Sequence, residues 1–228
     1  MVWCPPTGEE GFLMGSPADE EGRDDDELQN RVVLTKGFWL AKTECTQGQW
    51  ESVMGNNPSK FEGSKDLPVE TVSWEEVQGW LVMMNREHPL PTEAQWEYGC
   101  RAGTETVFGF GNSLSSEQAN FNGGSPYGGA AEGPFLRKTA EAGSYEPNGW
   151  GFYDMHGNVW EWRRDWYGEY EGVTERDPLG AKGGTYQVLR GGSWSNDARE
   201  CRAAVRVGSR AENRSSGIGF RPAVSSIK

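Results

Sequence analysis

The sequence predicts an irregular α+β fold with little regular secondary structure. Three observations support this fold class: glycine and tryptophan are abundant, long apolar runs are missing, and helix-start signals alternate with short strand-like segments. The 228 residues include 32 glycines and 11 tryptophans, so much of the backbone is expected in loops held by large aromatic side chains. Only 35% of residues are hydrophobic, but an aromatic content of 12% favours a folded core over disorder.

Strands are expected near both ends of the chain. The first residues, Met1 to Trp3, are expected to form a buried strand. β-Branched and aromatic residues next to turn residues indicate further strands. These segments are residues 12–15, 31–34, 37–40, 157–162, 187–190 and 218–221.

Three helices are expected between residues 46 and 101. Thr46 can cap the first, and Gly55 follows its last turn. Capping boxes at Ser73 and Thr92 predict the start of the other two, because a hydroxyl three residues before Glu or Gln satisfies the first backbone N–H groups. Trp50, Trp96, Trp160, Trp162 and Trp194 are expected to anchor the core.

Residues 102–150 are dominated by Gly, Ser, Asn and Pro and are expected to form a long loop. No repeat or linker interrupts the chain, which predicts a single domain over residues 1–228. No run of 18 apolar residues is present, so no membrane span is expected. No signal peptide begins the chain, which leaves the compartment open; export or surface display would need an upstream segment.

The formal net charge of −12 makes a nucleic-acid partner unexpected, because phosphate binding needs a basic surface. Seven acids crowd residues 19–27, which predicts a solvated loop, with a cation site as the alternative.

The four cysteines form no C-x-x-C pair and have no histidine cluster, so zinc is not expected. Cys45 and Cys100 are expected to be small core residues.

Seven motifs, in one order along nearly the whole chain, resemble the formylglycine-generating enzyme (sulfatase-modifying factor) family. The resemblance implies a C-type-lectin-like fold, in agreement with the irregular α+β expectation. Most of the tryptophans and glutamates in these motifs are expected to organise the fold, with Glu93, Glu97 and Glu161 accepting hydrogen bonds from loop backbone. The motifs are residues 12–16 (FLMGS), 44–50 (ECTQGQW), 67–70 (LPVE), 90–98 (LPTEAQWEY), 157–162 (GNVWEW), 190–194 (RGGSW) and 219–221 (GFR).

The resemblance implies that the oxidases of this family bind copper through two cysteines shortly after the GGS motif. Aligning the glycines places Cys201 at the second cysteine and Asn196 at the first. A carboxamide is a poor ligand for copper(I), which prefers thiolates, so copper and a catalytic site are not expected. Cys201 would be catalytic only if the protein is an enzyme. The two histidines are His88 and His156, and the latter is expected to be structural.

Residues 188–221 are predicted to be a variable, ligand-binding segment on this scaffold. Slots that hold asparagine in relatives carry mixed residues here, which resembles variable proteins of diversity-generating retroelements; drift of an exposed loop is the alternative. A protein or other macromolecule, acidic or carboxylate-bearing, is the expected partner, with Trp194, Arg199, Arg206 and Arg210 as anchors. The predicted ligand-binding residues are Trp194, Ser195, Asn196, Asp197, Arg199, Glu200, Val205, Val207, Gly208, Ser209, Arg210, Ser215, Ser216 and Gly217.

Structural calcium is the cofactor that the resemblance implies. One site would use the Asn148 side chain and the carbonyls of Gly149, Gly151 and Tyr153, oxygen ligands that suit a hard cation. The alternative for this motif is a simple Pro-Asn-Gly turn. A second site would use Asn120 and the Phe121 carbonyl, with an acid such as Glu132 nearby.

Three functions are therefore compared. The favoured hypothesis is a non-catalytic ligand-binding protein. The alternatives are a copper-dependent oxidase that converts sulfatase cysteines to formylglycine, and an assembly or sensor domain of a larger protein.

Overall fold

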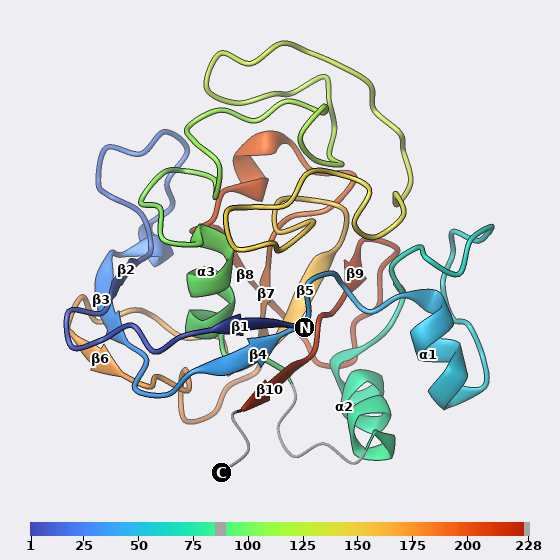
Figure 1. Cartoon of the computed structure of the whole chain (residues 1–228), viewed down its shortest axis with the longest axis horizontal. Coiled ribbons are helices and arrows are strands. Elements are labelled where there is room, and N and C mark those ends of the chain that lie inside the picture. The colour runs from blue at the N-terminus through green and yellow to red at the C-terminus, as the bar shows by residue number, and fades with distance from the viewer. Residues whose placement is uncertain (85–89, 226–228) are drawn as a thin grey trace.

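The computed structural model describes residues 1–84 and 90–225. These residues contain three short α-helices and three small sheets joined by long loops (Figure 1), which confirms the irregular α+β prediction. The helices are α1 (Gln47–Met54), α2 (Trp74–Met83) and α3 (Glu93–Arg101).

All three helices begin as predicted. The hydroxyls of Thr46, Ser73 and Thr92 each accept a hydrogen bond from the backbone N–H three residues on, and the Gln or Glu there accepts one in return. Gly55 ends α1 with φ of 74°, a left-handed conformation that glycine adopts without strain.

The first sheet has the order β1-β4-β10 and is antiparallel throughout. The predicted N-terminal strand is confirmed, but its burial was wrong: only Cys4 is buried, and 41% of Trp3 is exposed. Alternate residues of a strand face opposite sides, so Trp3 points outward and packs against Trp39 on the neighbouring strand. The strands are β1 (Val2–Cys4), β4 (Phe38–Leu40) and β10 (Ala223–Ser225).

The second sheet has the order β2-β3-β6. The antiparallel pair β2–β3 carries the first part of the chain, and β6 adds parallel to β3 from a segment more than 140 residues later. The strands are β2 (Phe12–Met14), β3 (Asn30–Val33) and β6 (Glu175–Arg176).

The third sheet has the order β8-β7-β5-β9, and three of its strands, β7, β8 and β9, come from the predicted ligand-binding segment. Its first strand begins at Trp160, three residues later than expected, because Gly157 and Asn158 have φ of 108° and 61° and cannot be extended. A side chain at Gly157 would lie 2.4 Å from the Asn120 carbonyl oxygen. The strands are β5 (Trp160–Trp166), β7 (Gln187–Arg190), β8 (Arg206–Ser209) and β9 (Ile218–Gly219).

Residues 102–159 contain no helix or strand. Their β-pairing is limited to isolated bridges. Figure 1 shows this loop, green to yellow, on the same side of the molecule as the 3-10 helix η2 (Ala198–Cys201). Two backbone hydrogen bonds join them: Asn122 donates to Asn196 (2.8 Å), and Ala198 donates to Ser125 (3.0 Å). The loop therefore borders the predicted ligand-binding segment.

Trp50, Trp96 and Trp162 are fully buried, as expected of core anchors, whereas Trp160 and Trp194 are half-buried. Cys45 and Cys100 also lie in the core. Among the described helices, none has the length and apolarity that a membrane crossing requires.

Candidate functional site

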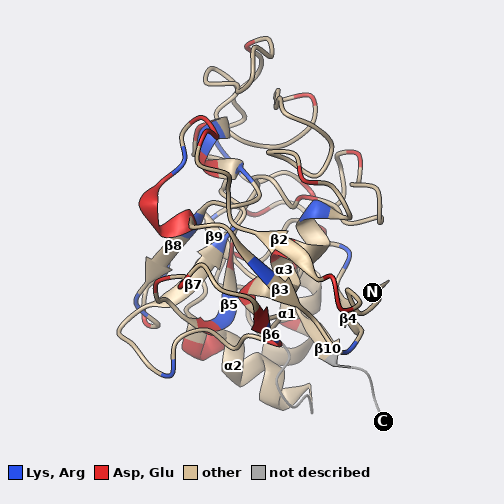
Figure 2. Ribbon diagram, turned by 90° about the vertical axis from the view of Figure 1, so that its left-hand side faces the viewer, with Lys and Arg blue, Asp and Glu red and all other residues tan. Residues whose placement is uncertain are grey.

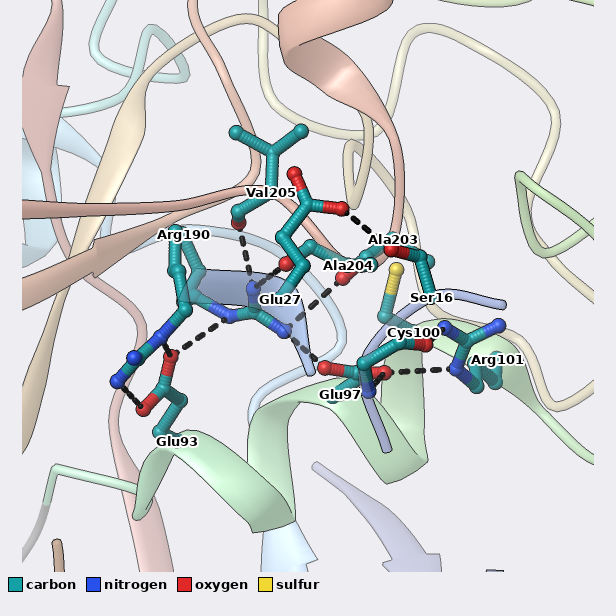
Figure 3. Close-up of polar contacts among 12 residues, drawn as sticks. Ser16, Glu27, Glu93, Glu97, Cys100, Arg101, Arg190, Ala203, Ala204 and Val205 are labelled. Atoms are coloured by element: carbon teal, nitrogen blue, oxygen red, sulfur yellow. Dashed lines mark hydrogen bonds and ion pairs between the residues drawn. The ribbon is translucent and has the colours of Figure 1, made fainter. Parts of the chain in front are cut away.

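Arg190 fastens the predicted ligand-binding segment to the rest of the fold. Its guanidinium, fully buried on β7, pairs with Glu97 of α3. The same group donates to three consecutive carbonyls, at Ala203 (3.0 Å), Ala204 (2.6 Å) and Val205 (2.5 Å) (Figure 3). Since the buried Arg190 side chain holds the backbone of residues 203–205, the path of the chain there does not depend on the exposed side chains around it.

Arg206, expected to be an exposed anchor, is instead part of this support. Only 5% of it is exposed, because its guanidinium forms two 2.8 Å bonds to the Glu93 carboxylate. Burial raises the pKa of Glu93, but the positive charges of Arg206 and Arg190 outweigh it, and the pKa lies below its ordinary value. The prediction that the Glu93 carboxylate accepts hydrogen bonds from loop backbone was wrong, because its partner is the Arg206 side chain.

The acidic stretch 19–27 is only partly solvated, which corrects the predicted loop. Glu27 is buried, and together with Glu20 it pairs with the buried Arg202 guanidinium at 2.7 and 2.5 Å. Figure 2 shows the 3-10 helix η1 (Asp25–Glu27) as a red coil near β8. The cation that these acids bind is thus a side chain of the predicted ligand-binding segment.

Glu161 of β5 likewise binds side chains and not loop backbone. Its carboxylate accepts hydrogen bonds from the Trp96 indole (2.9 Å) and the Arg163 guanidinium (2.7 Å), and pairs with Arg221 at 2.7 Å. All of these groups are buried. Glu97 alone among the three glutamates also accepts a backbone hydrogen bond, from Gly15 at 2.9 Å.

The structure divides the predicted ligand-binding residues by exposure. Three of them, Val205, Ser209 and Gly217, are buried and contribute no exposed surface, which corrects their assignment to the displayed face. Trp194, Asn196, Gly208 and Ser216 are half-buried. The exposed ones are Ser195, Asp197, Arg199, Glu200, Val207, Arg210 and Ser215.

Trp194 lies in an aromatic cluster that includes two residues missed by the sequence analysis. Phe61 packs edge-on against its ring with centroids 5.3 Å apart, and Phe135 stacks at 6.3 Å. Both phenylalanines are half-buried, and each has a cation near its ring: Lys60 at 5.3 Å and Arg137 at 5.4 Å. The sequence signal that could have identified these two residues is an aromatic residue one or two positions from a basic residue in a polar loop.

The turn that follows Trp194 is braced internally. The Asn196 amide oxygen accepts a hydrogen bond from Ser193 Oγ (2.6 Å), and its amide nitrogen donates to Glu200 (2.7 Å). Glu200 also accepts from the Asp197 backbone (3.3 Å) and completes the capping box of η2. Asn196 and Glu200 therefore shape the turn.

The Cys201 thiol is fully buried, and burial is the first cause that raises its pKa above the ordinary value. It packs against Gly192, where a side chain would lie 2.5 Å from the sulfur. A buried thiol does not fit a two-coordinate copper(I) site when the position aligned with its partner cysteine holds Asn196, whose amide is already hydrogen-bonded. Within residues 1–84 and 90–225, no cluster of three His, Cys, Asp or Glu could hold a metal ion.

His156 has a structural environment on both ring nitrogens. Nδ1 lies 2.8 Å from the Cys201 carbonyl oxygen, and Nε2 accepts from the Gly109 backbone N–H (2.9 Å). These partners fix a neutral ring, and burial lowers its pKa to about 4. His88 lies outside the described residues.

Two oxygens of the first predicted calcium site already accept hydrogen bonds within the protein. The Asn148 amide oxygen already accepts from the backbones of Trp150 and Phe152, both at 3.1 Å. The Tyr153 carbonyl accepts from the Arg221 guanidinium (2.9 Å), whose charge opposes a cation. Gly149 and Gly151 complete the tight turn that was the alternative for this motif.

Asn120 fits a cation better. Its amide nitrogen donates to Asn158 and to the Lys138 carbonyl, both at 3.0 Å, while its amide oxygen is buried without a hydrogen-bond partner among the described residues. A buried carboxamide oxygen with no donor is what a hard cation would use. Phe121 is buried beside it, and Glu132 is exposed.

Short strands, three helices, long ordered loops and a braced C-terminal segment define a C-type-lectin-like fold of the formylglycine-generating-enzyme type. Residues 6–226 match the sulfatase-modifying factor enzyme 1-like domain, and the chain belongs to this family.

Curated relatives support the assignment. The chain is 34% identical over 201 residues to the formylglycine-generating enzyme of Mus musculus, covering 84% of this chain and 52% of that protein. It is 33% identical over 168 residues to the mouse protein named inactive C-alpha-formylglycine-generating enzyme 2, covering 70% of this chain and 50% of that protein. The chain thus spans about half the length of these relatives.

A solved structure matches nearly the whole chain. Treponema denticola variable protein 1 superposes with a TM-score of 0.83 and 26% sequence identity, over 99% of this chain and 95% of that chain.

Proposed function

We propose that this protein binds a ligand without catalysis and presents the binding surface on a formylglycine-generating-enzyme-type scaffold. One observation carries the proposal: the position of the first copper cysteine is Asn196, whose amide braces a turn, while Cys201 is sealed in the core. The name of the mouse relative, inactive C-alpha-formylglycine-generating enzyme 2, is consistent with a family member that lacks the oxidase reaction.

The proposed binding surface centres on Trp194 and its neighbours Phe61 and Phe135, next to the exposed residues 195 and 197. Aromatic rings and arginines are the groups that most often carry interface energy. Lys60 and Arg137 lie over the two phenylalanine rings, so cations edge an aromatic patch on a chain of net charge −12. An acidic segment of a protein partner is the ligand that best complements this combination.

Sequence variation of this surface is part of the proposal. Of the exposed positions, Asp197 and Glu200 brace the local turn, whereas Arg190, Arg202 and Arg206 fix the backbone of the segment from the core. Such a division would let the displayed residues change while the fold persists. The similarity to Treponema denticola variable protein 1 supports diversification by a retroelement, and a template repeat with adenines at the displayed codons in the flanking DNA would test it.

Calcium belongs to the proposal as a structural ion at Asn120, because of its unpartnered buried oxygen. Its role would be to order the long loop 102–159 that borders the binding surface. Calorimetric titration of calcium into the chelator-treated protein and into Asn120→Ala tests this role; equal calcium binding by both would exclude it.

The binding experiment selects peptides from a displayed random library with the purified protein. We expect enrichment of acidic peptides that lose at least tenfold in affinity for Trp194→Ala, since aromatic anchors dominate interface energies. Trp39→Ala is the matched control, because Trp39 is a 43%-exposed tryptophan on another sheet. Equal loss in both variants, or selected peptides that ignore Trp194, would contradict the proposal.

The oxidase is the second candidate, and the 34% identity to mouse formylglycine-generating enzyme is the observation that favours it. Incubating the copper-treated protein with a Cys-x-Pro-x-Arg peptide tests it by mass spectrometry. We expect no conversion of the cysteine; formylglycine in the product would replace the binding proposal. Because the chain spans about half of its relatives, a role as one domain of a larger protein is compatible with the same binding surface.

A further inference from the structure

A cavity of about 550 Å³ lies away from the Trp194 surface, where the loop after β5 folds back toward β3, β6 and α3. Its volume is in the range of small-molecule sites. Gly180 allows the close approach of the loop, because a side chain there would lie 2.7 Å from Asp165 Cβ. The wall is formed by Met14, Asn30, Glu93, Ala94, Asp165, Trp166, Gly168, Glu169, Tyr170, Glu171, Glu175, Pro178, Gly180, Ala181, Lys182 and Arg206.

The wall carries excess negative charge. Glu93 and Arg206 neutralise each other through two 2.8 Å bonds. Four carboxylates then remain against the single cation Lys182. The remaining carboxylates are Asp165, Glu169, Glu171 and Glu175.

One buried acceptor in the wall lacks a donor. Asn30 is 4% exposed; its amide nitrogen donates to Glu175 (3.2 Å), and its amide oxygen is buried with no partner among the described residues. Buried acceptors of this kind are normally paired, so this oxygen points to a donor that comes from outside the chain. Asp165 lies in the same wall and is 3% exposed, and its Oδ2 accepts a hydrogen bond from the Glu93 backbone N–H (2.9 Å).

The geometry favours an organic cation over a metal ion. The carboxylates are spread around the wall, and within the described residues no three acids converge closely enough to hold a metal. The wall also contains the apolar Met14 and Ala94 and the half-buried indole of Trp166. Dispersed carboxylates with apolar and aromatic surface between them suit an alkylammonium, whose charged end pairs with a carboxylate while its chain packs on apolar atoms.

We propose that this cavity binds a small aliphatic amine, whose ammonium group donates to Asp165 Oδ1 and to the Asn30 amide oxygen. Burial, and after it the Glu93 charge, raises the pKa of Asp165 to about 7, so the carboxylate is poorly stabilised by the protein alone. Arg163 and Arg164 offset this only in part, and a bound ammonium ion would add a further positive charge. The inference does not depend on the function proposed for the Trp194 surface.

Isothermal titration with cadaverine tests the proposal, with pentanediol as the neutral ligand of similar length. We expect cadaverine to bind and pentanediol not to bind. Asp165→Asn keeps an acceptor for the Glu93 N–H but loses the charge, so its affinity for cadaverine should fall at least about tenfold. Asp66→Asn, a change at an exposed aspartate outside the cavity wall, should bind as the wild type does.

Glu175→Gln provides a second variant at a half-buried wall position should Asp165→Asn fail to fold, and a fall in affinity is expected there too. No binding of cadaverine, equal binding of pentanediol, or unchanged affinity in the cavity variants would each overturn the proposal. Calcium that binds at the cavity and displaces cadaverine would replace the amine with a metal ion.

Discussion

Arg202 and Arg206 lie between Arg199 and Val207 in one segment, yet the two pairs have opposite surroundings. The first pair is buried, and its guanidinium groups bond to glutamates about 110 to 180 residues earlier in the chain. The second pair is exposed. The partners of the buried pair lie in α3 and near η1, so the segment is held from outside itself. The exposed Arg199 and Val207 side chains therefore contribute little to holding this segment.

The largest expected effect comes from breaking the support. Arg190→Met would remove one of the two arginines that pair with the buried Glu97, and the donor to three backbone carbonyls. Removing one partner of a buried ion pair costs about 3–5 kcal/mol. Urea denaturation should show a loss of unfolding free energy of that size.

Arg176→Met is the control for this prediction, because Arg176 forms a solvent-exposed pair with Glu9. Exposed pairs contribute little, so its denaturation midpoint should stay close to that of the wild type. If both variants unfolded at the same urea concentration, the buried arginines would not be the support described above.

A medium effect is expected at Asp165, which contrasts with Glu93. Arginines lower the pKa of Glu93, whereas burial raises that of Asp165 to about 7. When the pKa of an acid is higher in the folded protein than in the unfolded chain, the protein loses stability as the pH rises between the two values, here from about 4 to 7. The reason is that the acid ionises first in the unfolded state. Asp165→Asn removes this cost, so it should stabilise the protein by about 2 kcal/mol more at pH 8 than at pH 5.

Denaturation curves of both proteins at the two pH values measure the difference. The same gain at pH 5 and pH 8 would show that Asp165 titrates normally. Cadaverine should reduce the gain at pH 8, because it stabilises the ionised wild-type side chain.

The smallest effect is expected on the displayed face. Ser195→Arg and Val207→Asn, made together, replace exposed residues that hold no part of the fold. Exposed substitutions of this kind usually change the free energy of unfolding by less than about 0.5 kcal/mol. A loss of several times that amount would show that displayed and supporting residues are not separable.

Local signals in the sequence predicted the helices, because each capping box lies within four residues. Strand positions near residues 12, 31 and 187 were also predictable from alternation and turn residues. The start of β5 was not, since the positive φ values at Gly157 and Asn158 depend on the approach of Asn120.

The candidate sites were less predictable, for a physical reason. Glu27 reads as a solvated acid in an acidic run, and only the fold brings Arg202 to it. Phe61 and Phe135 join Trp194 from segments that are distant in sequence. The amine cavity has no local motif either, because Asn30 and Asp165 meet only where two sheets and a loop come together.

The burial of all four native thiols has a practical consequence. Reagents that modify sulfur should leave the folded wild-type protein untouched, since Cys201 and its counterparts are shielded from solvent. A single cysteine introduced in place of Ser195 would then be the one position to accept a fluorophore or spin label. Its signal would report directly on what approaches the aromatic patch.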